Sequence, residues 1–453
     1  MIFLKRRRLA VWLFKAYFKK WRKTIFLSFI FGLIVFFILR FGVNYFIPLI
    51  PFTHKETIGL VGAYTPDNLP PIILSKLSKG LTSIDNKDNI MPNIAKSWDI
   101  RNDGKKYIFY LKDNIYFNDG KKLTSKEITY NFLDVSVERP NDNTIIFNLK
   151  NKYSPFLITV SRPIFRKEFV GTGDYRVQSI NLNGNFVQTI NLVSIKPPIK
   201  ELSYQFYPTE ESLKTAFVLG EISKVIGVKS EKFNDRKLSD FPNAVIDKKI
   251  DTSQLVTIFY NTQDKELSDK RLREALSYAV PNEFIQGERN YGSFRPDTWV
   301  SKDGLTTYQQ DFEHARILLG ETESATHSAK FVLEIKTLPQ YKEVAEEIKK
   351  NWEKIGIKSK ILSVDALPQT FQVFLGDFNV PKDPDQYTLW HSSQENNITG
   401  YKNLRIDKLL EDGRQIVDMS ERKKIYSDFQ KYLLDDSPAT FLYFPYEYEI
   451  TRK

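Results

Sequence analysis

The chain has 453 residues and a formal net charge of +11, and it is long enough for two or three domains with substantial cores. Ten Lys and Arg residues but no Asp or Glu lie in residues 1–53, which leaves 56 basic against 55 acidic residues in 54–453. A nearly neutral body argues against a nucleic-acid partner. The absence of cysteine excludes disulfides, thiol nucleophiles, Cys-ligated metals and a lipidated N-terminal Cys.

The N-terminal region has the pattern of a membrane anchor. The uncharged run at 24–39 spans roughly 24 Å as a helix, and its continuation to Val43 reaches about 30 Å, the thickness of a bilayer core. Nine upstream cations predict a cytoplasmic N-terminus. Bulky residues after the run argue against a cleavable signal peptide, the main alternative. We expect a basic cytoplasmic segment at 1–23, a single-pass transmembrane helix at 24–46 in the cell membrane, and a linker at 47–56.

The body alternates between strand-like and helix-like patterns. Apolar runs predict strands at 57–64, 94–100, 107–111, 144–149, 175–180, 186–193, 200–206, 255–260, 331–335, 357–364 and 440–446. Helical spacing predicts helices at 72–81, 210–219, 269–280, 312–319, 341–355, 407–417 and 421–434. This alternation indicates a mixed α/β protein of several lobes.

Local turn and cap signals refine this reading. Asp-Gly pairs at 103–104 and 119–120 stand between apolar runs, which is the pattern of a tight hairpin. Thr124–Glu127 matches a capping box and predicts a helix start, with apolar residues within 128–133 on the buried face. Ser268 is expected to cap the helix that follows it.

Motifs for catalysis or nucleotide binding are missing from the sequence. It has no GxxxxGK[ST] loop, no GxSxG elbow and no HExxH helix. The four histidines are isolated, and the acidic loop that begins at Asp377 departs from the EF-hand pattern at its fifth, sixth and twelfth positions. We therefore expect no enzyme activity, no cofactor and no metal site.

Several blocks, taken in order, resemble the family 5 extracellular solute-binding proteins, the oligopeptide- and dipeptide-binding class of ABC importers. The blocks are MPNIAKSWDIRNDGKKYIFYLKDNIYFNDGKKLTSKEI (91–128), GTGDYRV (171–177), FYNTQDKELSDKRLREALSYAV (259–280), DFEHARILLGE (311–321), YKEVAEEIKKNWEKIGIKSKI (341–361), TGYKNLRIDKLLEDGR (399–414) and PATFLYFPY (438–446). Asp174 stands where the family usually has proline. The resemblance covers residues 57–450.

The resemblance implies a periplasmic-binding-protein-like, two-lobed fold of type II with a reduced extra domain. The implied solute-binding domain, 57–450, divides into lobe I (about 54–80, 165–250 and 435–453), a small domain (about 81–164) and lobe III (about 251–434). It implies a membrane-anchored, extracytoplasmic protein that binds peptide between its lobes and delivers it to ABC permease subunits. The alternatives are a non-peptide solute, such as a metal chelate, an opine or a sugar, and a sensor that retains the fold without transport.

The resemblance also implies a ligand site. Peptide-binding members hold the ligand's α-ammonium with an Asp that follows an apolar strand, because a desolvated ammonium needs a carboxylate. Two registers are open here, Asp377 or the Asp383–Asp385 pair, and we prefer Asp377 because it ends a buried strand. Backbone edges would pair with the peptide, and side chains would form walls. The expected ligand-binding residues are Val61, Gly62, Ala63, Tyr64, Thr65, Phe374, Leu375, Gly376, Asp377, Asp383, Asp385, Trp390 and His391.

Overall fold

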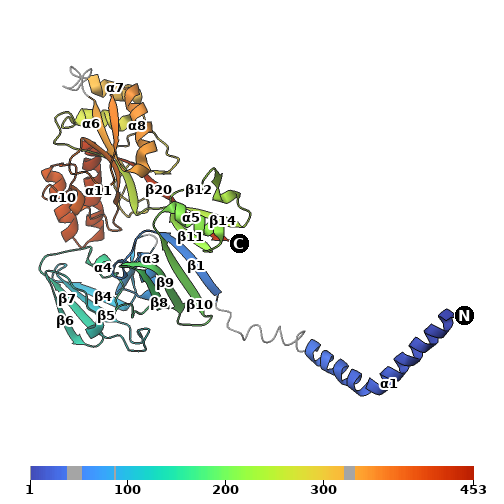
Figure 1. Cartoon of the computed structure of the whole chain (residues 1–453). Coiled ribbons are helices and arrows are strands. Elements are labelled where there is room, and N and C mark those ends of the chain that lie inside the picture. The colour runs from blue at the N-terminus through green and yellow to red at the C-terminus, as the bar shows by residue number, and fades with distance from the viewer. Residues whose placement is uncertain (1, 38–53, 86–87, 321–331) are drawn as a thin grey trace. The chain divides into compact units, whose positions relative to one another are not determined.

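The structure is a computed structural model that describes residues 2–37, 54–85, 88–320 and 332–453. It contains two compact units, and the N-terminal part belongs to the first. The units are Met1–His54 with Lys196–Lys200, and Lys55–Ile195 with Glu201–Lys453. In the first unit, α1 (Ile2–Phe37) is one helix of 36 residues (Figure 1). Among the described residues, no helix combines the length and apolar character needed to cross a membrane. The expected transmembrane segment continues into residues 38–46, which lie outside the described residues.

A twelve-stranded sheet organises the second unit (Figure 1). Its main path runs through β18 (Ser359–Ser363), β17 (Leu333–Thr337), β19 (Val373–Asn379), β15 (Gln254–Tyr260), β20 (Ala439–Arg452), β11 (Lys224–Val228), β1 (His54–Val61), β10 (Lys200–Tyr207), β9 (Phe186–Ser194) and β8 (Tyr175–Asn183). Two further strands, β14 (Ala244–Ile250) and β16 (Gly287–Arg289), pair with β20.

Strand β20 joins the two halves of this sheet. Its first residues, 439–443, pair with β15, and its last residues, 446–452, pair with β14. A second chain crossing lies beside it, where the Asp251 N–H donates to the Pro445 carbonyl at 2.8 Å. The sequence predicts this strand only as far as Tyr446. The extension forms because β14 pairs with it along its whole second half.

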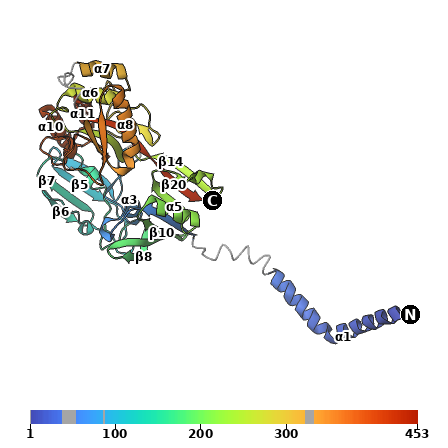
Figure 2. The ribbon, with the colours of Figure 1, turned by 45° about the horizontal axis from the view of Figure 1, so that its top comes forward.

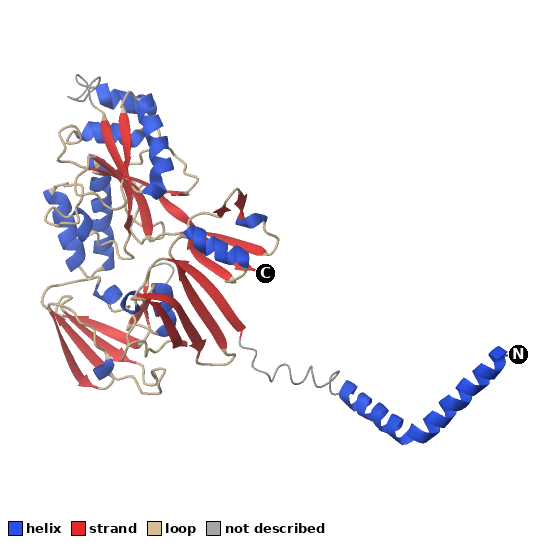
Figure 3. Cartoon of the chain, viewed as in Figure 1, coloured by secondary structure: helices blue, strands red, loops and turns tan. Residues whose placement is uncertain are grey.

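Helices cover both faces of the β18–β20 half of the sheet (Figure 3). Side chains alternate along β15, so Val256 and Ile258 join one core and Leu255 and Phe259 join the other. The first core contains α6 (Lys270–Tyr278), α7 (Phe312–Gly320) and α8 (Lys342–Lys354). The second contains α9 (Tyr387–Trp390), α10 (Leu404–Gln415) and α11 (Met419–Asp436).

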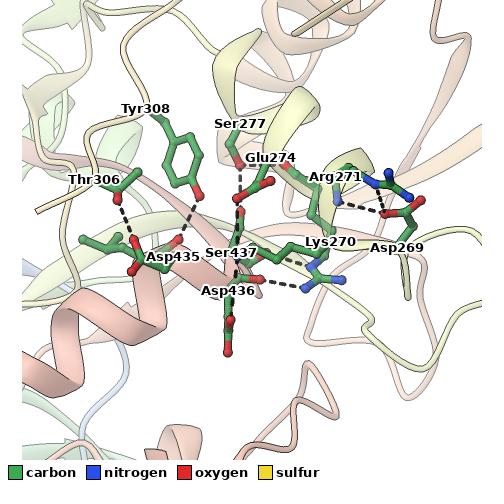
Figure 4. A network of polar contacts seen from close by, with 12 residues as sticks. Asp269, Lys270, Arg271, Glu274, Ser277, Thr306, Tyr308, Asp435, Asp436 and Ser437 are labelled. Atoms are coloured by element: carbon green, nitrogen blue, oxygen red, sulfur yellow. Dashed lines mark hydrogen bonds and ion pairs between the residues drawn. The ribbon is translucent and has the colours of Figure 1, made fainter. Parts of the chain in front are cut away.

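A buried polar network holds the turn from α11 into β20 against α6 (Figure 4). The Arg273 guanidinium donates to the Ser437 carbonyl at 2.9 Å and to the Asp436 carbonyl at 2.7 Å. The Ser277 hydroxyl lies 3.1 Å from that of Ser437 and 2.6 Å from that of Thr440. These bonds satisfy the carbonyls at the end of α11, which no helical N–H can reach. They fix the starting position of β20.

The other half of the sheet is covered by two shorter helices. The first, α3 (Pro71–Leu77), packs on the face of β1 that carries Ile58 and Leu60. The second, α5 (Glu210–Leu219), lies on the opposite face. A Cβ at Gly59 would come within 2.2 Å of the Leu213 side chain, so only glycine lets α5 approach β1 this closely.

A separate four-stranded sheet, β4-β5-β7-β6, forms the small-sheet region together with β2, β3 and α4 (Figure 2). The elements are β2 (Thr82–Ile84), β3 (Ile90–Pro92), β4 (Ala95–Arg101), β5 (Lys106–Leu111), β6 (Val135–Asn141), β7 (Thr144–Leu149) and α4 (Phe156–Thr159). The predicted Asp-Gly turn at 103–104 joins β4 to β5, as expected. Aromatic residues of β5, β7 and α4 fill the core.

Two local predictions are wrong. Thr124–Glu127 opens only a 3₁₀ turn, and Thr124 makes no side-chain cap bond. Ile128 has extended backbone angles, and Arg139 donates to the carbonyls of Ser125 and Ile128 at 2.9 and 2.8 Å, which stabilises this non-helical path. Within the expected buried face, Leu133 is 92% exposed.

The second wrong prediction concerns the cap of α6, which is Asp269 and not Ser268. The Asp269 carboxylate accepts from the Arg271 N–H at 2.9 Å. A carboxylate also interacts favourably with the positive end of the helix dipole, so Asp269 is the stronger cap.

Candidate functional site

The three candidate aspartates differ in their partners, and two of them are paired with arginine. Asp383 is buried, and one of its carboxylate oxygens lies 2.7 Å from Nη2 of the buried Arg422. Asp385 lies 3.0 Å from Nε of Arg414 and accepts from the Tyr387 N–H at 3.2 Å. Burial raises the pKa of Asp385 to about 6, although Arg414 acts in the opposite direction. Each of these carboxylates already has a cation of the chain beside it.

Asp377 has a different environment. It is half-buried in β19, and the Tyr341 hydroxyl at the start of α8 donates to its Oδ1 at 2.8 Å. Among the described residues, no Lys, Arg or His nitrogen comes within 4.0 Å of its carboxylate. Burial raises the pKa of Tyr341 and the Asp377 carboxylate raises it further, so the phenol remains a donor. Asp377 therefore keeps acceptor capacity for a cation from outside the chain.

A cavity of about 250 Å³ opens beside Asp377. Its walls are largely apolar, and they include Phe259, Leu338, Phe374, Phe378, Leu389 and Trp390. The Trp390 indole is held in place because its Nε1–H donates to the Gln386 side chain at 3.0 Å. Side chains alternate along β19, so the Asp377 carboxylate points to the face of Tyr341, whereas Phe374 and Phe378 line the cavity from the other face.

The expected open edge over Phe374 and Leu375 is wrong, because β19 lies between two strands there. These residues pair with β15 on one side and with β17 on the other. The pairing with β17 stops at Leu375, and Gly376, the next residue of β19, is buried. Phe374 contributes its ring to the cavity wall, and Leu375 packs in the opposite core. A Cβ at Gly376 would lie 2.4 Å from the Phe374 ring, so the ring position depends on this glycine.

The other expected edge, Val61–Thr65, follows the end of β1. Gly62 has φ of +130°, and its N–H donates to the last carbonyl of β10 at 2.9 Å. The Tyr64 carbonyl accepts from an N–H of β9 at 2.7 Å, and its ring packs on Phe206. Ala63 is exposed. The structure thus uses part of this segment for its own packing, and among the described residues no hydrogen bond links it to Asp377.

His391 follows Trp390 at the end of α9. It is 8% exposed, and its ring stacks on Tyr387 with 4.2 Å between centroids. Nε2 lies 3.3 Å from Glu411, and Nδ1 lies 2.9 Å from the Ser393 hydroxyl. Where the chain is described, no group of three His, Asp or Glu side chains is arranged to hold a metal ion.

The main residue that the sequence did not reveal is Tyr341. It was predicted as the first buried residue of the helix at 341–355, and nothing in that pattern indicated that its hydroxyl reaches a strand 36 residues later. The apolar walls of the cavity could be predicted in part from the sequence, because Phe374 and Phe378 are spaced to lie on the same face of β19.

Comparison with known proteins decides the family. The protein-family model described as "Bacterial extracellular solute-binding proteins, family 5 Middle" matches residues 89–400. The chain belongs to this family. The resemblance is confirmed, and this family 5 chain is a substrate-binding protein of an ABC importer with the mixed α/β, periplasmic-binding-protein-like fold.

Relatives of this family 5 protein match most of its length. The oligopeptide-binding protein AppA of Bacillus subtilis is 26% identical, over 84% of this chain and 83% of that protein. The ABC transporter substrate-binding protein CtaP of Listeria monocytogenes is 20% identical, with a TM-score of 0.76 over 88% and 94% of the two chains. NikZ of Campylobacter jejuni, solved with Ni(L-His), is 22% identical, with a TM-score of 0.70 over 88% and 94%. The two structures show the fold alone.

Proposed function

We propose that this family 5 protein binds peptides, with the ligand's N-terminal ammonium at Asp377. The observation that carries the proposal is the difference among the three aspartates. Asp383 and Asp385 face Arg422 and Arg414, whereas Asp377 is half-buried without a cationic partner among the described residues. An ammonium that leaves water needs a carboxylate, and charge-assisted bonds are the strong ones.

The Tyr341 hydroxyl fixes the carboxylate for this role. It donates to Oδ1 of Asp377, which holds the group in one orientation and leaves the remaining lone pairs free for an ammonium. The apolar cavity next to it takes the first side chain of the peptide. The backbone of β19 beyond its pairing with β17, from Gly376 onward, would offer the next peptide bonds hydrogen-bonding groups.

Closure of two lobes around the peptide would present the bound form to the permease. In the proposed lobe I (54–80, 165–250 and 435–453), residues 439–443 pair with β15 of the proposed lobe III (251–434). The chain therefore passes between the two halves of the sheet at Asp251 and, within β20, near Pro445. Two adjacent strand connections are the kind of hinge that lets domains close around a ligand. Membrane attachment through 24–46 would keep the protein next to its permease.

The relatives widen the possible ligands, since AppA is named for oligopeptides and NikZ holds Ni(L-His). The chemistry of this cavity favours a peptide over a sugar, because a sugar needs several polar wall groups and this wall is largely aromatic and aliphatic. A sensor that keeps the fold without transport remains the alternative for the role in the cell.

The test is isothermal calorimetry on the full chain in detergent. Leu-Ala and Ala-Leu peptides, maltose and a nickel–histidine complex are titrated separately. We expect saturable heat with the peptides. Heat with maltose or the nickel complex and none with either peptide would overturn the proposal.

A further inference from the structure

The first unit carries a cavity of its own, on the surface of α1. Its volume is about 640 Å³, and its walls are Phe18, Arg22, Lys23, Phe26 and Phe29. We call it the α1 hollow. Phe18, Arg22 and Phe26 follow one another at intervals of four residues, and Phe29 stands three residues further on, so they share one face of the helix. The volume falls within the range of ordinary ligand sites, about 300–1,000 Å³.

The charge of the α1 hollow is positive and has no counterpart in its own unit. Arg22 and Lys23 both line the hollow, and both are exposed. Neither Met1–His54 nor Lys196–Lys200, which together form the first unit, contains an Asp or Glu residue. The two cations therefore attract an anion from outside this unit.

The remaining walls of the α1 hollow are aromatic. Phe26 and Phe29 are 64% and 65% exposed, and they lie in the uncharged run that begins directly after Lys23. Large rings that remain this exposed gain free energy when an apolar group covers them. The hollow thus offers adjacent sites for a negative charge and for an apolar chain.

The spacing of these two parts matches one leaflet of a bilayer. Arg22 and Phe29 are seven residues apart, which is roughly 10 Å along a helix. One leaflet contributes about 15 Å to a hydrocarbon core of about 30 Å. An anionic headgroup at Arg22 therefore places its acyl chain beside Phe26 and Phe29. A guanidinium also matches the geometry of a phosphate group, to which it can donate two hydrogen bonds.

A second copy of α1 is a poor occupant for the same hollow. It would bring a further Arg22 and Lys23 against the first pair, and the first 53 residues supply no carboxylate to separate them. Like charges in close contact repel, and they do so more strongly where water is excluded. The charge of the hollow therefore favours a lipid over another helix of this chain.

We propose that the α1 hollow binds an anionic phospholipid, with the phosphate at Arg22 and Lys23 and an acyl chain along Phe26 and Phe29. This site is separate from the peptide site and does not depend on the proposed function. It differs from a general attraction between a basic segment and a membrane. Such an attraction would act equally on Lys15 and Lys20, two exposed lysines of α1 that do not line the hollow.

The experiment uses native mass spectrometry of the full chain in detergent, titrated with phosphatidylglycerol or with phosphatidylcholine of the same acyl chains. We expect the first phosphatidylglycerol to bind about twentyfold more tightly, because each cation near an anionic headgroup contributes roughly a fivefold preference. Arg22→Gln/Lys23→Gln should abolish this preference. Lys15→Gln/Lys20→Gln removes the same charge outside the hollow and should retain it. Gln has nearly the helix propensity of Lys and Arg, so both variants keep α1.

The role of the rings is measured separately. Phe26→Ala/Phe29→Ala should weaken both lipids, and glycerol phosphate, which lacks acyl chains, should not bind the wild-type protein. Full lipid affinity in the Phe variant, or binding of glycerol phosphate, would show an anion site without a lipid chain and would contradict the proposal. Equal affinities of the wild-type protein for the two lipids, or an equal loss of preference in both double charge variants, would also overturn it.

Discussion

The Tyr341 hydroxyl donates to the Asp377 carboxylate at 2.8 Å, across the boundary between α8 and β19. Tyr341 precedes the first residue of α8, Asp377 lies two residues before the end of β19, and the aspartate has no cationic partner among the described residues. The bond therefore orients a carboxylate that retains its capacity for a ligand's charge. Four predictions concern this arrangement and the residues around it.

Tyr341→Phe removes the donor and keeps the ring. We expect peptide affinity to fall about tenfold, because a hydrogen bond to a charged group contributes roughly 1.5–3 kcal/mol and water replaces part of it. Calorimetry with Leu-Ala measures the change. Tyr110→Phe is the matched control, since the Tyr110 hydroxyl donates to the Asp99 carboxylate at 3.0 Å in the small-sheet region. Equal effects of the two substitutions would contradict the role of Tyr341.

Asp383→Asn should weaken folding more than ligand binding. It leaves the buried Arg422 without its carboxylate, and breaking a buried pair by removing one partner costs about 3–5 kcal/mol. Urea unfolding measures the loss of stability. Asp142→Asn breaks an exposed pair with Lys126 and should change stability by less than about 1 kcal/mol. A large loss of peptide affinity in folded Asp383→Asn would instead place Asp383 at the ligand.

The raised pKa of Asp385 predicts that the stability of the folded protein depends on pH. Its folded pKa is raised to about 6 by burial, above the usual value near 3.8. Between those values the folded state binds more protons than the unfolded state, so this group's contribution to stability falls as pH rises from about 4 to 6 and is constant above. Asp385→Asn should flatten the stability profile in that window relative to the wild-type protein. Identical slopes in urea unfolding at pH 4, 5, 6 and 7 would contradict the assignment.

Gly376→Ala should reduce the size of the Asp377 cavity. The new methyl group would lie 2.4 Å from the Phe374 ring and would push the ring from its place in the wall into the cavity. We expect peptides that begin with Leu to lose affinity and peptides that begin with Gly to lose much less. Gly320→Ala at the end of α7 is the control, because nothing lies within 4 Å of its added Cβ. Equal losses for both peptides would show that the cavity does not hold the first side chain.

Sequence patterns predicted the elements whose signal is local. The helix α5 was expected at its observed bounds because its apolar spacing lies within one short segment, and the structure adds a capping box at Thr209. The strand β14 was not expected, since its residues are mostly exposed and it becomes a strand by pairing with β20 some 200 residues later. The segment after Thr124 is not helical, and Arg139 stabilises its path through a contact that no local rule contains.

The candidate site also combines features that the sequence indicated with features that it did not. The family resemblance predicted a ligand carboxylate at Asp377 or at the Asp383–Asp385 pair, and the burial of β19 was visible in its apolar run. The Arg422–Asp383 and Arg414–Asp385 pairs join residues 39 and 29 positions apart, so the sequence did not indicate which aspartate lacked a cation. The order of the strands could not be predicted from the sequence either. Phe374 and Leu375 were expected at a free edge of the sheet, but β17 pairs with them in the structure.

The most direct test of ammonium binding at Asp377 combines one modification of the ligand with one of the protein. Calorimetry compares Leu-Ala with N-acetyl-Leu-Ala on the wild-type chain and on Asp377→Asn. We expect acetylation to cost the wild-type protein about 2–5 kcal/mol of binding free energy, and to cost Asp377→Asn much less, because the charge has already lost its partner. An equal loss on acetylation in both proteins, or no loss in either, would contradict the account.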